Sequence, residues 1–150
     1  MDVLHEFRGF NSRLDPLQAA ILSVKLRHLN SWNERRAAIA ELYSGRLGDS
    51  QIDVPAVPDW ADPAWHLYVI QSDRRDELAG ALRASGIETL IHYPIPPHRQ
   101  RAYDAFGSAN LPIADRLAGR VLSLPIGPHL ALEQAGRVVE AVLAAVGSAG

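Results

Sequence analysis

The sequence of 150 residues contains no cysteine. This absence excludes disulfide bonds, thiolate metal sites, iron–sulfur clusters and cysteine nucleophiles together. Long apolar runs are absent too: the longest, Val138–Val146, is interrupted by Glu140 and is far shorter than the roughly 20 residues of a membrane-spanning helix. The first ten residues carry Asp2, Glu6 and Arg8 and do not resemble a signal peptide. We therefore expect a soluble, cytoplasmic chain without a membrane partner.

Lysine is nearly absent as well. Of the fifteen basic residues, Lys25 is the only lysine and the others are arginine. Any chemistry that needs a lysine amine must therefore use Lys25 or come from another polypeptide. The net charge of −2 gives no general attraction for nucleic acid.

Several motifs of well-known sites are missing. The sequence has no HExxH, GxGxxG, GxxxxGK[ST] or GxSxG, which argues against a zinc protease, a dinucleotide or nucleoside triphosphate site, and a serine hydrolase. The six histidines show no recognised ligand spacing, so we predict no metal.

What is present begins with a long helix. Asp15 can accept hydrogen bonds at a helix start, and Pro16 suits the first helical position. Two apolar stripes follow at helical spacing, Leu22, Leu26, Leu29 and Trp32 beside Leu17, Ile21 and Val24. Two stripes indicate a helix, over about 15–47, that is covered on more than one side by another domain or subunit.

The rest of the chain alternates between short strands and helices. Strands are predicted over 65–71, 89–92 and 121–124, and helices over 73–85, 99–106, 112–119 and 130–146. Asp73 is expected to cap the first of these helices and Gly86 to end it. The pattern predicts an α+β fold: a long N-terminal helix leads into a small, mainly antiparallel sheet covered by helices. We divide the chain into an interface segment (1–14), a connecting helix (15–47) and a small α/β domain (48–150).

One polar segment, Gly9–Asp15, precedes the helix. It offers the amide of Asn11, the hydroxyl of Ser12 and the guanidinium of Arg13, all of which can donate hydrogen bonds to an anion. Polar residues before a helix also serve turns and caps, so a structural role remains open on composition alone.

A second polar segment, Ile91–Gln100, is rich in proline. Its prolines fix the backbone, while His92, Tyr93, His98 and Gln100 present donors and acceptors around it. Such a loop could hold a polyol substrate at low ordering cost. It could equally be a rigid connection whose polar side chains meet water.

These two segments, together with LRHLNSWNERRAAIAELY, HLYVIQ and VLSLPIGPHL, resemble the C-terminal part of the DegT/DnrJ/EryC1/StrS aminotransferases. The resemblance extends from Gly9 to Val146 in the family's order. The motif HYPxPxHxQ is most similar to that of members making 3-amino-3,6-dideoxyhexoses on thymidine diphosphate. The family consists of pyridoxal-phosphate (PLP) enzymes, and the resemblance implies the C-terminal small domain of a fold-type-I aminotransferase.

The resemblance also implies an activity. The enzymes of this family move an amino group, usually from L-glutamate, to a keto-sugar linked to a nucleotide, in amino-sugar, polysaccharide or antibiotic biosynthesis. Their active sites lie at the interface of a homodimer. In the family, the lysine that binds PLP lies in an N-terminal domain preceding Gly9, so Lys25 does not match it. We therefore expect this chain to lack that domain and to be inactive alone.

Site residues follow from the same resemblance. Asn11 would contact the PLP phosphate of the neighbouring subunit, and Arg13 would help to neutralise it. His92, Tyr93 and His98 would line the sugar-nucleotide pocket, with His98 meeting the diphosphate or a hexose hydroxyl. Gln100 and Tyr103 would support that pocket, and none of these residues would transfer protons. The alternative is a free-standing sugar-nucleotide-binding or regulatory module without transaminase activity.

Overall fold

The computed structural model describes residues 14–106 and 110–147. The chain divides into two compact units, residues 1–31 and 32–150. Helix α1 (Pro16–Leu26) belongs to the first unit, and it begins as predicted. The Asp15 carboxylate accepts hydrogen bonds from the backbone N–H groups of Leu17 and Gln18 at 2.8 and 3.2 Å, which satisfies two donors at the helix start.

The predicted single helix over 15–47 is in fact two helices. After α1 the chain turns, and α2 spans Leu29–Leu47. The backbone N–H groups of Arg27 and His28 donate to carbonyls three residues earlier, at 3.3 and 2.9 Å, and this tighter winding ends α1. No proline or glycine lies at the break, and the apolar residues keep their helical spacing across it. The sequence pattern therefore does not reveal where α1 ends.

The sheet of the second unit has two antiparallel strands, β1 (Tyr68–Gln71) and β2 (Val121–Leu124). Tyr68 pairs with Leu124 at one end of the ladder. The strand predicted over 89–92 is reduced to a single bridge between Leu90 and Ser123. The proline that follows at position 94 cannot donate to a ladder, which limits this segment to one pair.

Helices α3 (Arg75–Ala84), α4 (Pro112–Arg120) and α5 (Leu132–Gly147) lie close to their predicted positions, and two 3-10 helices, η1 (Pro97–Arg99) and η2 (Arg101–Phe106), replace the helix predicted over 99–106. Gly86 follows α3 with φ of +75°, as its predicted role requires. The prediction that Asp73 caps α3 is wrong. Ser72 Oγ instead accepts the N–H of Arg74 at 3.2 Å, and Asp73 forms an ion pair with Arg120.

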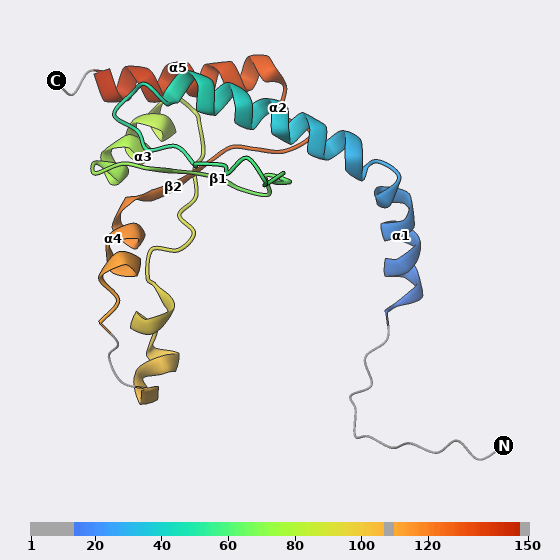
Figure 1. Ribbon diagram of the computed structural model, residues 1–150, viewed down its shortest axis with the longest axis horizontal. Helices are drawn as coiled ribbons and strands as arrows, with labels where there is room; N and C mark the ends of the chain where they lie inside the picture. The colour runs from blue at the N-terminus through green and yellow to red at the C-terminus, as the bar shows by residue number, and fades with distance from the viewer. Residues whose placement is uncertain (1–13, 107–109, 148–150) are drawn as a thin grey trace. The chain divides into compact units, whose positions relative to one another are not determined.

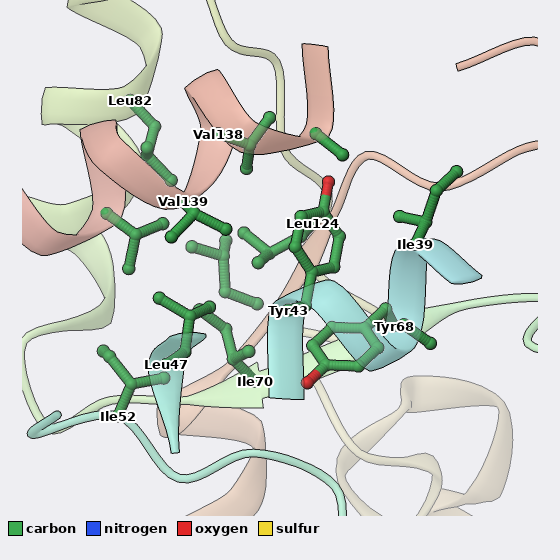
Figure 2. Close-up of a cluster of buried hydrophobic side chains, with 14 of the residues drawn as sticks. Ile39, Tyr43, Leu47, Ile52, Tyr68, Ile70, Leu82, Leu124, Val138 and Val139 are labelled. Atoms are coloured by element: carbon green, nitrogen blue, oxygen red, sulfur yellow. The ribbon is translucent and has the colours of Figure 1, made fainter. Parts of the chain in front are cut away.

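The hydrophobic core joins both strands to α2, α3 and α5, whose buried side chains point toward one another (Figure 2). Tyr43 and Tyr68 lie at its centre with ring centroids 5.1 Å apart. Their hydroxyls are not left unpaired: Tyr43 donates to the Pro125 carbonyl and Tyr68 bonds Ser44 Oγ, both at 2.8 Å. Burial raises the pKa of both tyrosines because the phenolate would lose its hydration.

The predicted α+β fold with a small antiparallel sheet is thus confirmed (Figure 1). Arg46 of α2 and Glu140 of α5 form an ion pair at 2.6 Å at the edge of the core. In the described part of the chain, no helix is both long and apolar enough to cross a membrane.

Candidate functional site

The second polar segment leaves the sheet beside Ser123 of β2. Leu122 and Leu124 belong to the core cluster, so the alternation of a strand directs Ser123 to the opposite face. Leu90 pairs with the backbone of Ser123 there, with N···O distances of 2.7 and 3.3 Å. Two residues further on, His92 Nδ1 lies 2.8 Å from Ser123 Oγ. The sheet therefore fixes the first histidine of the segment.

Tyr93 follows directly and is largely exposed, with 71% of its surface accessible. Its ring meets that of His92 edge-on, with centroids 5.6 Å apart. An exposed tyrosine can offer both an apolar ring face and a hydroxyl group to a ligand.

The turn that follows is closed by its own hydrogen bonds. The N–H groups of Arg99 and Gln100 donate to the carbonyls of Pro96 and Pro97 at 2.9 and 3.0 Å. The side-chain amide of Gln100 donates to the Ile95 carbonyl at 3.0 Å. Gln100 is thus used, at least through its nitrogen, to hold the shape of the turn.

His98 meets helix α4 rather than the sheet. Its Nε2 atom lies 3.0 Å from Oδ1 of Asp115, in the first turn of α4, and only 9% of the His98 side chain is exposed. Arg99 contacts the same carboxylate through Nε at 3.2 Å and a terminal nitrogen at 2.8 Å. The hydrogen bond from Arg99, more than any other cause, holds the pKa of Asp115 below its usual value, because it favours the charged form.

We call His92–Gln100, with Ser123 and Asp115, the histidine turn. In Figure 1 the yellow segment carrying η1 and η2 runs beside orange α4, and the His98–Asp115 contact joins them. Apolar side chains around this turn are exposed to solvent: Leu90, Ile95, Leu111 and Ile113. A polar turn with an apolar surround is typical of a site completed by another surface.

Arginines anchor the far end of α4. The buried Arg75 donates to the carbonyls of Ala118 and Val121 at 3.3 and 3.2 Å, which would otherwise lack partners at the helix end. Arg120 pairs with Asp53 at 3.0 Å and with Asp73 at 2.8 Å. The helix that carries Asp115 is therefore attached to the core at its other end.

The structure brings together four of the six predicted site residues: His92, Tyr93, His98 and Gln100 lie on one turn. Asn11 and Arg13 fall outside the described residues. Tyr103 lies on η2 with half of its surface exposed.

Sequence reasoning missed Ser123, Asp115 and Arg99. We predict the VLSLP segment only as a strand and as part of the resemblance, although a serine between two apolar leucines of a strand is a polar side chain directed to the other face. We predict Asp115 only as part of a helix. Acidic residues are common in the first turn of a helix because they interact favourably with its dipole, so the sequence gives no signal that Asp115 contacts a histidine. Within the residues that are described, no three histidine or acidic side chains gather to bind a metal.

The residues described do not by themselves fit PLP. The cofactor needs a lysine amine to bind covalently, and Lys25 is exposed on α1, a helix with no buried residue. Its amine is exposed to solvent rather than enclosed by the described residues, so we assign no step of the cofactor's chemistry to this chain.

The architecture matches that of fold-type-I aminotransferases, as a C-terminal portion of them. The crystal structure of S. venezuelae DesV in complex with a ketimine intermediate is 49% identical, with a TM-score of 0.85 over 95% of this chain and 39% of that one. An aminotransferase from Brucella abortus is 37% identical, with a TM-score of 0.86 over 93% of this chain and 38% of that one.

The model of the DegT/DnrJ/EryC1/StrS aminotransferase family matches residues 1–143. The chain belongs to this family, whose aminotransferases depend on PLP. One relative, dTDP-3-amino-3,4,6-trideoxy-alpha-D-glucose transaminase of Streptomyces venezuelae, is 51% identical over 92% of this chain and 37% of its own length. The erythromycin biosynthesis sensory transduction protein EryC1 of Saccharopolyspora erythraea is 51% identical over 91% of this chain and 38% of its own length. The chain thus spans less than two fifths of these relatives.

Proposed function

We propose that this chain is the C-terminal part of a PLP-dependent aminotransferase that moves an amino group, from L-glutamate, to a nucleotide-linked keto-sugar. Its share of the work is to bind and orient the sugar nucleotide through the histidine turn. The observation that carries this proposal is that His92 and His98 are each held at one ring nitrogen, by Ser123 at 2.8 Å and Asp115 at 3.0 Å. Side chains held in this way are prepared to bind a ligand without losing further freedom.

The same proposal includes Asn11 and Arg13 as contacts to the cofactor phosphate of a neighbouring subunit in a homodimer. Their roles rest on the resemblance of the Gly9–Asp15 segment. We propose no proton transfer for His92, Tyr93 or His98, because the lysine that would perform it belongs to polypeptide outside this chain.

The exposed residues of helix α1 support the proposal that this chain binds a partner. Its apolar side chains are more than half exposed: Leu17 76%, Ile21 51%, Leu22 51%, Val24 57% and Leu26 68%. These side chains lie on two sides of the helix, Leu17, Ile21 and Val24 on one and Leu22 and Leu26 on the other, and exposed apolar surface of this extent is typical of an interface. The matched relatives are much longer than the matched part, so we propose that this surface binds the N-terminal, cofactor-carrying part of the enzyme.

The purified chain tests the first half of the proposal. We expect it to bind dTDP-glucose in a calorimetric titration, to give no imine absorbance with PLP, and to aminate no keto-sugar. Replacing His92 by alanine should weaken dTDP-glucose binding, whereas the matched His129→Ala change, outside the turn, should not. Transaminase activity of the chain alone would overturn the proposal.

Co-expression tests the second half. The chain is combined with the N-terminal part of the Streptomyces venezuelae transaminase, the 63% of that protein that it does not match. Amination of a dTDP-linked keto-sugar should appear only when both parts are present. Co-purification without activity would support the interface but contradict the catalytic assignment.

A second function is favoured by the names of two relatives, the sensory transduction protein above and a pleiotropic regulatory protein of Geobacillus stearothermophilus, 41% identical over 92% of this chain. The chain would then bind a sugar nucleotide as a regulatory module. Binding of dTDP-glucose without restored activity in the co-expression test would favour this reading.

A further inference from the structure

The Asp115 carboxylate decides which nitrogen of His98 carries a proton. An ionised carboxylate only accepts hydrogen bonds, so the Nε2 atom that faces it at 3.0 Å must be the donor. Arg99 engages both oxygens of the same carboxylate and keeps it ionised. His98 therefore has its Nε2 proton fixed by a group 17 positions later in the chain.

The consequence concerns the other nitrogen. In the neutral imidazole one nitrogen donates and the other accepts, so in that form of His98 a donor at Nε2 makes Nδ1 the acceptor. Across the described ranges 14–106 and 110–147, the structure gives this Nδ1 no hydrogen-bond partner. An acceptor suits a hydroxyl group and does not suit a phosphate, which is itself an acceptor.

We propose that Asp115 is a positioning residue that holds His98 with Nδ1 available to accept a hydrogen bond from a hydroxyl of the hexose. This inference rests on the proposed sugar-nucleotide function and deepens it. Of the two partners expected for His98, the diphosphate and a hexose hydroxyl, it selects the hydroxyl. Arg99 acts with Asp115, since its guanidinium contacts both oxygens of the carboxylate that faces His98.

The first test concerns His98 alone and needs no ligand. Long-range proton–nitrogen NMR spectra of the labelled chain at pH 8, above the usual range of imidazole titration, should show Nε2 protonated and Nδ1 bare. In Asp115→Ala the exchange of the Nε2 proton with water should become about tenfold faster, because a hydrogen bond to a charged group is lost. Asp115→Glu should restore part of the protection. A protonated Nδ1, or an unchanged exchange rate in Asp115→Ala, would overturn the proposal.

Glu77→Ala is the matched control. Glu77 lies in the first turn of α3 and pairs with the exposed Arg74, as Asp115 lies in the first turn of α4 and pairs with Arg99. The control therefore removes the same helix-end charge and the same kind of ion pair without touching His98. It should leave the His98 spectrum unchanged.

The second test separates positioning from general damage. Calorimetry with dTDP-glucose and with dTDP, which lacks the hexose, should show that Asp115→Ala weakens binding of the sugar nucleotide about tenfold, as expected for one lost hydrogen bond. Binding of dTDP should stay the same. An equal loss for both ligands, or no loss for either, would overturn the hydroxyl assignment. If the unaltered chain binds neither ligand, the proposed function and the hexose contact fail together, and the NMR result still decides whether Asp115 holds His98.

Discussion

The Nδ1 atom of His92 lies 2.8 Å from the Oγ atom of Ser123, 31 positions later in the sequence. Ser123 is 5% exposed and sits between two core leucines of β2. This pair connects the hydrophobic core to the turn that carries the candidate binding residues. Ser123 is the direct chain neighbour of two core residues, so its hydrogen bond to His92 ties the position of that histidine to the core.

Replacing Ser123 by alanine tests this connection. The change removes one hydrogen bond from a buried hydroxyl, and we expect the free energy of unfolding to fall by about 1 kcal/mol. Binding of dTDP-glucose should weaken because His92 loses its support. Urea denaturation and calorimetry measure the two effects. The control is Ser23→Ala on α1, where the exposed hydroxyl bonds only the Ala19 carbonyl of its own helix; comparable losses there would contradict the argument.

The second prediction concerns the contribution of Arg75 to the free energy of unfolding. Its side chain is buried and donates to two carbonyls at the end of α4. Arg75→Met keeps the aliphatic stem but removes the charged donors, so we expect a loss of about 2 kcal/mol in the free energy of unfolding. Arg83→Met, an exposed position of the same helix, should change that free energy by no more than about 0.5 kcal/mol. Equal effects of the two substitutions in urea denaturation would show that Arg75 does not anchor α4.

The stability of the histidine turn should depend on pH through Asp115. Its pKa is lower in the folded chain than its ordinary value, chiefly because of Arg99. A carboxyl group with a depressed native pKa stabilises the fold fully above its unfolded pKa, near 3.9. That contribution is lost as the pH falls through the lower native value, where Asp115 becomes protonated in both states.

We therefore expect the difference in unfolding free energy between the unaltered chain and Asp115→Asn to shrink as the pH is lowered from 6 toward 3. Urea denaturation over a series of pH values measures it. Asp62→Asn alters an exposed aspartate for which the described residues provide no ion pair, and its difference from the unaltered chain should not follow the same course. A difference for Asp115→Asn that stays constant with pH would contradict the assignment.

Local signals in the sequence predicted much of the fold. Asp15 before Pro16 marked the start of α1, and Gly86 marked the end of α3, because each acts on the backbone next to it. The position of β2 was also predicted, since four consecutive residues of suitable type sufficed.

Features that depend on distant partners could not be predicted. Asp73 looks like a helix cap in sequence, but Arg120 competes for its carboxylate. The roles of Ser123 and Asp115 depend on contacts with histidines 31 and 17 positions away. No periodicity reports such pairs, so only the folded chain shows that both histidines are held.

The exposed apolar side chains of α1 lead to the last prediction. Ile21→Glu places a charge on a surface that is 51% exposed at that residue. In the chain alone, we expect the free energy of unfolding to change by no more than about 0.5 kcal/mol, as for an ordinary surface substitution. In co-expression with the N-terminal part of the Streptomyces venezuelae transaminase, the charge would be buried without a partner, so co-purification and activity should both be lost. Gln18→Glu adds the same charge to the exposed start of α1, where a helix tolerates it, and should preserve association. If Ile21→Glu associates as well as the unaltered chain, α1 does not bind the N-terminal part.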